Sequence, residues 1–438
     1  MNENFKLFKL GELAEIIAGG DKPKIFTERK SNINCIPVVA NGENKDGLLG
    51  YTDLPKIVEA AVTISARGSK VGFAAIRKQP FFPIVRLLTL IPIKERLYVD
   101  FLYYKLKQNR QGGTGSGQPQ ITIPDISNKS ISIPSLPTQK KIAAVLSALD
   151  DKIELNNQIN MELEAMAKTL YDYWFVQFDF PVTKNGHPEL VEGYKSSGGK
   201  MVFDETLKRE IPEGWEVKII GDIISKIESG KRPKGGINKN LKIGIPSLGA
   251  ESIDKLGVFN FQNTKYIPFE YKNKITSGII QDNDILIYKD GAYVGKTTLF
   301  RDDFPYEFAT INEHVFLVRT KQKEYQEYLL FTLMQDYYFD IMQSLGQKAA
   351  QPGLNQEDLK SIKILVPNKQ VILNFQNKII NFLKKIFSNS KQNQELAQLR
   401  DWLLPMLMNG QVTVGDAEGM GMVAEEKSTY SKKIFNNG

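Results

Sequence analysis

Two long stretches of the chain carry apolar residues at alternating spacings of four and three, the pattern of a helix that buries one seam against another helix. The first stretch has no glycine or proline between Thr138 and Phe180, and Pro405 should end or kink the second near its last turn. The seam positions are Ile142, Leu146, Leu149, Ile153, Asn156, Asn160, Leu163 and Leu170 in the first helix, and Phe375, Ile379, Phe382, Ile386, Asn389, Asn393, Leu396 and Leu403 in the second.

Two asparagines interrupt each seam at equivalent places, Asn156 and Asn160 in the first helix and Asn389 and Asn393 in the second. A buried asparagine in an apolar seam lowers stability but fixes the register, because only one alignment lets the amides pair. The alternative is that the four residues lie at a solvated wide point of the pair. The pattern favours pairing between the helices.

The two helices carry opposite charge. Residues 138–181 hold 4 Lys and Arg against 7 Asp and Glu, whereas residues 368–414 hold 6 against 2. In a duplicated chain such helices meet most simply across a pseudo-two-fold axis, which makes them antiparallel. A helix of about 37 residues rises roughly 55 Å, so the pair would hold the parts of the chain at its two ends far apart. Such a separation suits a long partner that is contacted in two places, and duplex DNA fits this description.

The chain is a tandem duplication. Gly20, Pro23 and Lys24 recur as Gly230, Pro233 and Lys234, an offset of 210, and the segment GSKVG at 68–72 recurs as GAYVG at 291–295, an offset of 223. The offset reaches 233 at Gln118-Pro119 and stays there through the helices. Because it only grows, insertions in loops of the second copy explain it.

Each copy begins with a mixed module, so the predicted fold class is α+β: two α/β modules separated by two long helices forming an antiparallel coiled coil with pseudo-two-fold symmetry. Strands are expected at 62–66, 87–93, 284–288 and 314–319, and shorter helices at 99–107 and 325–334. The expected divisions are a first module, 1–136; a central helix, 137–181; a polar connector, 182–210; a second module, 211–367; a C-terminal helix, 368–414; and a disordered tail, 415–438.

Composition narrows the class of protein. The 438 residues are 42% hydrophobic and 24% charged, as in a soluble globular protein, and the net charge of +7 permits a polyanionic partner. The single cysteine, Cys35, excludes an internal disulfide framework, and His187 and His314 are too few for a His-rich or Cys/His metal site. Without a signal peptide or a long apolar run, a cytoplasmic protein without a membrane partner is expected.

No catalytic centre is recognisable. The segment from Gly291 to Thr297 approaches a P-loop, but it has three residues between its glycines where four are needed to wrap a phosphate. A glycine turn between two strands is favoured, and a nucleotide-using enzyme is the alternative. His187 lies in the connector and His314 is expected to be an ordinary strand residue, so neither supports a catalytic triad. No catalytic, cofactor-binding or metal-ligating residue is assigned.

Basic residues lie beside glycines and aromatic residues at equivalent places in both modules. Residues 1–137 hold 19 Lys and Arg against 12 Asp and Glu, whereas residues 211–367 hold 20 of each. Arginine can read guanine through two hydrogen bonds, and lysine mostly neutralises phosphate. The alternative is an ordinary solvated surface charge. The candidate DNA-binding residues are Lys22, Lys24, Arg67, Lys70, Arg77, Lys78, Lys231, Arg232, Lys234, Lys289 and Lys296.

The layout resembles the specificity subunit of type I restriction-modification systems. The resemblance covers residues 1 to about 414 and is strongest in the helix segment 136–180 and in the connector segment 193–218, GYKSSGGKMVFDETLKREIPEGWEVK. Trp215-Glu-Val followed by Gly221-Asp222 also matches the family pattern. The second helix, with Phe382 and Pro405, is less regular than the first.

The resemblance implies a non-catalytic DNA-recognition subunit that reads a bipartite, interrupted target in double-stranded DNA. Two adenine methyltransferase (modification) subunits would dock on the helices, and restriction/translocase subunits would join them. S-adenosylmethionine, ATP and Mg are then expected in the partner subunits and no cofactor in this chain. The alternatives are a specificity subunit of a methylation-only or fused methyltransferase-nuclease system, and a protein-protein scaffold that does not bind DNA.

Overall fold

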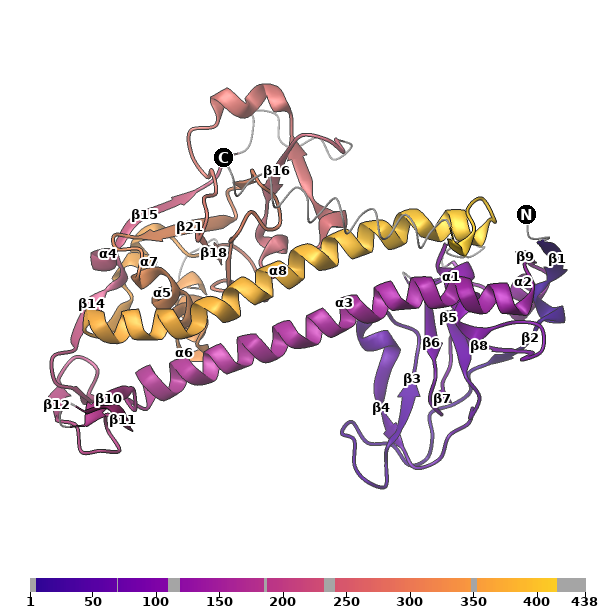
Figure 1. Cartoon of the computed structure of the whole chain (residues 1–438), viewed down its shortest axis with the longest axis horizontal. Coiled ribbons are helices and arrows are strands. Elements are labelled where there is room, and N and C mark those ends of the chain that lie inside the picture. The colour runs from indigo at the N-terminus through magenta and orange to yellow at the C-terminus, as the bar shows by residue number, and fades with distance from the viewer. Residues whose placement is uncertain are drawn as a thin grey trace. The chain divides into compact units, whose positions relative to one another are not determined.

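The computed structural model describes residues 5–68, 70–108, 119–184, 187–231, 241–347 and 353–415. The chain divides into two compact units. Unit 1 comprises Met1–Ile153 and Glu395–Gly438, and unit 2 comprises Glu154–Gln394. Two long helices, α3 (Leu136–Tyr171) and α8 (Lys369–Met408), each contribute one segment to each unit (Figure 1). Each unit therefore contains one mixed module and one pair of helix segments.

Unit 1 is built around a four-stranded antiparallel sheet against which helix α1 packs. Other strands of the module form a three-stranded sheet, in which β3 and β7 are parallel. A separate two-stranded sheet pairs the first strand of the module with the last. In sheet order the strands are β2 (Ala14–Ala18), β8 (Leu87–Pro92), β5 (Ala61–Ser65) and β6 (Ala74–Arg77); β4 (Leu48–Thr52), β3 (Ile36–Val39) and β7 (Phe82–Pro83); and β1 (Lys6–Lys9) and β9 (Ser130–Ile133). The helices are η1 (Leu10–Glu12), η2 (Asn44–Gly47), α1 (Val99–Gln108) and α2 (Ile123–Ser127).

Unit 2 repeats these sheets strand for strand, in the same order. They are β15 (Ile224–Ser229), β21 (Val315–Thr320), β18 (Ile285–Tyr288) and β19 (Thr297–Leu299); β17 (Lys265–Ile267), β16 (Ile245–Leu248) and β20 (Thr310–Ile311); and β14 (Glu216–Ile219) and β22 (Lys363–Val366). Besides its segments of α3 and α8, its helices are η3 (Asp172–Val176), α4 (Ile220–Ile223), η4 (Ala250–Ser252), η5 (Phe261–Asn263), η6 (Phe269–Lys274), α5 (Tyr325–Leu333), α6 (Asp336–Gln347) and α7 (Gln356–Ser361).

The duplication extends to single backbone hydrogen bonds. Ala66 N–H donates to Arg86 O over 2.9 Å, as Lys289 N–H donates to His314 O over 3.0 Å. Ile121 N–H donates to Ala66 O, and its counterpart Leu354 N–H donates to Lys289 O. The predicted tandem α+β duplication is confirmed, and the strands and helices expected from the pattern are present within about two residues of their expected ends.

The helix segments pair antiparallel within each unit. In unit 2 Asn156 hydrogen-bonds Asn393, while Asn160 further along α3 hydrogen-bonds Asn389 further back along α8. In unit 1 the guanidinium of Arg400 on α8 hydrogen-bonds Asp150 on α3. The antiparallel arrangement predicted from the opposite charges is confirmed.

The paired asparagines are not at a solvated point. Asn156, Asn160 and Asn389 are at most 8% exposed, and Asn393 is half-buried. Their amides pair across the helices, and Asn393 also donates to Asn157 Oδ1 over 2.8 Å. The solvated alternative is therefore wrong for these residues, because three of the four are closed off from water.

The other seam positions differ in burial. Six are fully buried, and Leu149, Ile153, Leu163, Leu170, Phe382 and Leu396 are half-buried. The fully buried apolar positions are Ile142, Leu146, Phe375, Ile379, Ile386 and Leu403, together with Leu383 next to the half-buried Phe382. Pro405 lies inside α8, which ends three residues later at Met408.

The polar connector is folded into two hairpins, β10 (Pro181–Lys184) with β11 (His187–Gly193) and β12 (Met201–Asp204) with β13 (Arg209–Pro212). Aromatic side chains attach it to the segment that follows α3, since the rings of Phe180 and Tyr194 stack with centroids 4.6 Å apart. The composition of this segment predicted a connection between the modules but not its strand pairing.

The expected disordered tail falls almost wholly on residues 416–438, outside the described residues. Among the described helices, none is both long enough and apolar enough to cross a membrane.

Candidate nucleic-acid interface

In unit 1, several loops leave the four-stranded sheet at one edge. Because neighbouring strands are antiparallel, β2 and β5 end where β8 begins, with Ala18 opposite Leu88 and Ser65 opposite Leu87. The loops 19–24, 66–73 and 84–86 therefore emerge together, and we call them, with residues 40–43, the loop edge of unit 1. Loops on a rigid sheet are the usual place for binding residues.

Hydrogen bonds hold these loops to one another. Ile84 N–H donates to Val39 O over 3.0 Å, and the Asn41 side chain donates to Arg67 O over 2.8 Å. Gly19 passes so close to the next loop that a Cβ on it would lie 2.0 Å from Ile84 O, so only glycine fits. The loop edge is a single connected surface.

Four of the six candidate basic residues of unit 1 lie on this edge: Lys22, Lys24, Arg67 and Lys70. All four are exposed. The Lys22 ammonium lies 3.4 Å from the centroid of the Phe26 ring, and Lys70 forms an ion pair with Glu43 over 2.5 Å. The edge is predominantly basic and accessible to a polyanion.

Arg77 and Lys78 lie at the other end of the sheet, because Arg77 at the end of β6 is opposite Ala61 at the start of β5. Arg77 donates to Thr63 Oγ1 over 3.2 Å and to the carbonyl of Asp46, and its burial lowers the pKa of the guanidinium. Lys78 binds Asp100 at 2.6 Å, and that hydrogen bond raises the pKa of Lys78. The structure does not bring these two residues together with the other four.

Unit 2 has an equivalent loop edge. Strands β15 and β18 end where β21 and β19 begin, with Tyr288 opposite Val315 and Ile287 opposite Thr297. The edge comprises residues 230–231, 249–254, 289–296 and 312–314, and holds the candidates Lys231, Lys289 and Lys296. Candidates Arg232 and Lys234 lie outside the described residues.

Carboxylates accompany the cations of this second edge. Lys296 pairs with Asp254 at 2.8 Å, and Lys289 lies 3.8 Å from Asp290 while donating to Glu313 O over 3.3 Å. His314 was expected to be an ordinary strand residue, but it precedes β21 and contacts two carboxylates, Asp290 at 3.0 Å and Glu313 at 3.3 Å. The loop edge of unit 2 therefore offers mixed donors and acceptors, unlike the basic edge of unit 1.

The segment from Gly291 to Gly295 is the predicted glycine turn. It joins β18 to β19, and Gly291 and Gly295 have φ of 119° and 90°, a region that favours glycine. A P-loop needs a helix after its glycine loop to direct N–H groups at a phosphate. Because this turn leads into a strand, the nucleotide-using alternative is wrong for this segment.

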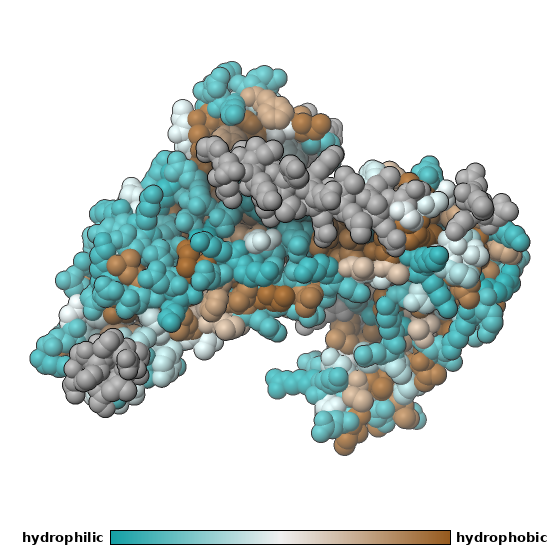
Figure 2. Space-filling view, viewed as in Figure 1, coloured by the Kyte–Doolittle hydropathy of each residue, from teal (hydrophilic) through white to brown (hydrophobic). Residues whose placement is uncertain are grey.

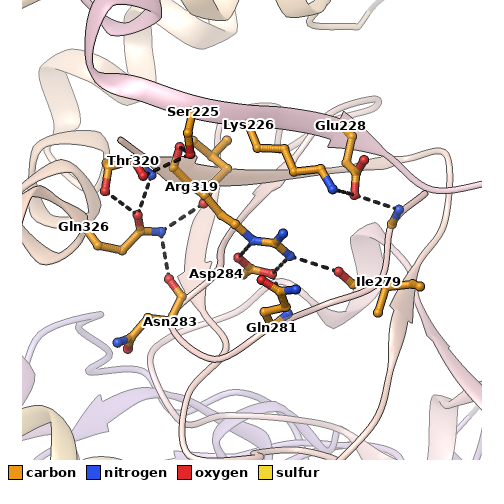
Figure 3. Close-up of polar contacts among 12 residues, drawn as sticks. Ser225, Lys226, Glu228, Ile279, Gln281, Asn283, Asp284, Arg319, Thr320 and Gln326 are labelled. Atoms are coloured by element: carbon orange, nitrogen blue, oxygen red, sulfur yellow. Dashed lines mark hydrogen bonds and ion pairs between the residues drawn. The ribbon is translucent and has the colours of Figure 1, made fainter. Parts of the chain in front are cut away.

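At the opposite edge of unit 2 the polar side chains are engaged with one another (Figure 3). The guanidinium of Arg319 holds both carboxylate oxygens of Asp284, which is fully buried, and donates to Ile279 O over 3.0 Å. Burial raises the pKa of Asp284 above its usual value, although Arg319 opposes this shift. Arg319 therefore stabilises the fold at the edge opposite the loop edge.

Two residues of the loop edges escaped the sequence reasoning. Arg86 is exposed and has a φ of 67° at the start of β8, and Tyr293 is exposed at the tip of the glycine turn. Arg86 has no glycine or aromatic residue next to it in the sequence, so it is not among the candidate DNA-binding residues. Tyr293 could have been found from the repeat, since the offset of 223 aligns it with Lys70.

Side chains on helix α3 form a further accessible surface. Figure 2 shows hydrophobic side chains gathered along the middle of this helix, where Leu155, Met161 and Met166 are each about half exposed, at 49%, 49% and 54%. Exposed apolar residues of this size along one helix are typical of a surface that another protein covers.

Over the ranges that the structure describes, no three or more His, Cys, Asp or Glu side chains are grouped so that they could hold a metal ion.

Comparison with known proteins places this geometry in a family. The family model described as type I restriction modification DNA specificity domain matches residues 2–165 and again 212–400. The chain belongs to this family, and the two matches correspond to the two copies of the duplicated fold.

Individual relatives agree with this assignment. The chain is 27% identical over 409 residues to the type I restriction enzyme MjaIX specificity subunit of Methanocaldococcus jannaschii, covering 90% of this chain and 88% of that one. It is 29% identical to the HindI specificity subunit of Haemophilus influenzae, covering 71% and 74%. The crystal structure of a type I restriction-modification S subunit from M. genitalium has the same fold, with a TM-score of 0.60, 17% identity and coverage of 93% and 96%.

Proposed function

We propose that the chain is the DNA-recognition subunit of a type I restriction-modification complex and that each unit reads one half of a bipartite target. The observation that supports this proposal most directly is the loop edge, which is built twice on the same sheet and turn. Two equivalent reading surfaces in one chain suit a target made of two separate half-sites.

The two edges would use different chemistry. Lys22, Lys24 and Arg67 of unit 1 can neutralise phosphates, which provides affinity that is independent of sequence. In unit 2, Asp254, Asp290 and Glu313 would repel phosphates but can accept hydrogen bonds from the amino groups of bases in the major groove. The unit 2 edge therefore suits contact with base edges more than contact with the phosphate backbone.

Helices α3 and α8 would set the separation between the half-sites. Helix α3 has 36 residues, which at about 1.5 Å per residue rise roughly 54 Å. The buried asparagine bonds that fix the register of the pair would make this length constant. A fixed length implies a fixed number of unread base pairs between the two halves.

The chemistry would be performed by partner subunits. The hydrophobic surface along α3, with Leu155 and Met166, suits the docking of methyltransferase subunits, and a restriction/translocase subunit would join the complex. S-adenosylmethionine, ATP and Mg would be bound by those partners. The chain itself would be non-catalytic and act in the cytoplasm.

Methylation-sensitive sequencing of a genome with and without this gene tests the proposal. The expected result is an adenine-methylated motif of two short halves separated by a fixed gap, present only with the gene. If the motif is absent, a titration of the purified complex with duplex DNA decides between DNA binding and a pure protein scaffold. DNA binding must weaken steeply as salt rises, because phosphate contacts release counterions.

A further inference from the structure

The glycine turn on the loop edge is the most closely repeated feature of the two units. In unit 2 Gly295 N–H donates to Tyr288 O over 2.8 Å and Lys296 N–H donates to Tyr293 O over 3.0 Å. In unit 1 the same two bonds join Gly72 to Ser65 over 2.8 Å and Phe73 to Lys70 over 3.1 Å. The same two hydrogen bonds thus close the turn in both units, whereas the residue at its tip differs: Lys70 in unit 1 and Tyr293 in unit 2.

Residues of helix α6 contact the turn of unit 2 and hold it in place. Val294 is buried, its carbonyl accepts a hydrogen bond from Gln343 Nε2 over 2.7 Å, and a Cβ on Gly346 would lie 2.9 Å from its side chain. Gly295 packs so tightly that a Cβ would lie 2.7 Å from Met342 Cβ. Helix α6 therefore holds the turn rigidly one residue away from its exposed tip.

The tip itself is an aromatic ring directed at solvent. Tyr293 is 61% exposed, and its ring meets that of Tyr288 edge-on, with centroids 6.3 Å apart. A tyrosine presents an apolar ring and a polar hydroxyl, so on the loop edge it can contact both apolar and polar groups of a partner. Lys289 and Lys296 flank it in the sequence, and each lies beside a carboxylate, Asp290 and Asp254 respectively.

We propose that Tyr293 is a specificity-determining residue whose ring makes apolar contact with a thymine methyl group at a base edge in the major groove of the half-site read by unit 2. A base edge is accessible in a duplex, whereas the faces of its bases are covered by neighbouring base pairs, and a preformed turn loses little conformational freedom on binding. Lys70 at the equivalent tip of unit 1 has no ring, so the two half-sites are contacted by different chemistry at the same place. This inference rests on the proposed function.

The test measures binding of the full complex, isolated with its partner subunits, to fluorescent duplexes with and without the target motif. Tyr293→Ala is expected to weaken binding to the target about five- to 150-fold, the effect of losing the contact with one base pair, and to leave binding to unrelated DNA unchanged. Tyr293→Phe should bind like the natural protein, because it keeps the ring. Tyr337→Ala is the matched control, since Tyr337 is a tyrosine of the same unit that is 65% exposed but lies on α6.

The outcomes separate this inference from the proposed function. If the natural complex does not prefer its motif over unrelated DNA, the proposed function fails and the inference fails with it. If it does prefer the motif but Tyr293→Ala keeps the same preference, the inference alone is overturned. Equal losses of target binding and unrelated binding would also overturn it, because they would assign Tyr293 to phosphate contact.

Discussion

Asn389 donates a hydrogen bond from its side-chain amide to Oδ1 of Asn160 over 2.9 Å, in the interior of the helix pair of unit 2. Asn160 donates in turn to Ser390 Oγ and to the carbonyl of Ile386, both at 3.3 Å. These bonds link residues about 230 positions apart in the sequence, and a slip of one helix along the other would break them all. The asparagines therefore specify one alignment of α3 against α8.

Removing one partner of this pair should destabilise the protein. Asn389→Ala leaves a buried carbonyl oxygen of Asn160 without that donor, which costs about 1–3 kcal/mol of unfolding free energy. The double variant Asn160→Leu with Asn389→Leu should be close to the natural protein in stability, because no unpaired polar group is left. Urea unfolding followed by circular dichroism measures both, with Gln158→Ala on the exposed face of α3 as control. Equal stability for the single variant and the control would contradict the register role.

A buried ion pair in unit 2 joins Arg301, which follows β19, to Glu327 on α5. Arg301 and Glu327 are 3.2 Å apart with side chains 6% and 2% exposed, and Glu327 also accepts from Gln376 on α8 over 2.9 Å. Glu327→Ala should cost about 3–5 kcal/mol, because it leaves Arg301 buried without its partner. Breaking the exposed pair of Lys208 and Glu205 by Lys208→Ala should cost at most about 1 kcal/mol. Similar losses of unfolding free energy for the two variants, measured by thermal unfolding, would contradict the burial of the Arg301–Glu327 pair.

The unfolding free energy of unit 1 should depend on pH because the pKa of Asp150 is lowered in the folded state. Burial alone would raise the pKa of Asp150, but Lys107 and Arg400 outweigh it, so the pKa lies below the usual 3.8. A carboxylate with a lowered pKa stabilises the folded state at neutral pH, and this contribution disappears as the pH falls through the lowered value. The stability difference between the natural protein and Asp150→Asn should therefore shrink below pH 3.8. Asp151→Asn, an exposed neighbour, is the control, and a difference that persists unchanged at low pH would contradict the role of Asp150.

Two glycines with positive φ allow the energetic cost of an unfavourable backbone conformation to be distinguished from the cost of a steric clash. Gly295 and Gly198 have φ of 90° and 83°, but a Cβ on Gly295 would meet Met342 at 2.7 Å whereas nothing lies within 4 Å of one on Gly198. Gly198→Ala should cost about 1–2 kcal/mol for the conformation alone. Gly295→Ala should cost about 1–3 kcal/mol more because of the clash, as measured by thermal unfolding. Equal costs would mean that α6 does not brace the turn.

Much of the architecture follows from the sequence because it depends on repetition and periodicity. The offsets between the copies and the seams from Ile142 and Phe375 predict the duplicated modules and the long antiparallel helices. The hairpins of the connector could not be predicted in this way, because their stability comes from contacts such as that of Tyr194 with Phe180, which composition does not reveal.

The candidate interface was only partly predictable for a related reason. The pattern of basic residues selects Lys70 and Lys289 but also Arg77, which strand pairing places opposite Ala61 at the far end of the sheet. Sequence gives the position of a charge along the chain, whereas antiparallel pairing decides which end of the sheet it occupies. Arg86 was passed over because the β7–β8 connection that carries it to the loop edge has no local signature.

The most direct test of the central claim lengthens the helix pair and determines the methylated motif. One heptad that keeps the seam pattern is inserted after Asn157 in α3, and a matching heptad is inserted after Lys391 in α8, so that Asn156 and Asn157 stay opposite Asn393 and Asn160 stays opposite Asn389. Single-base sequencing of methylated adenines should then show the same two half-sites with a longer gap between them. An unchanged gap, or a motif that is not divided into two halves, would contradict the claim that two reading units are separated by helices of fixed length.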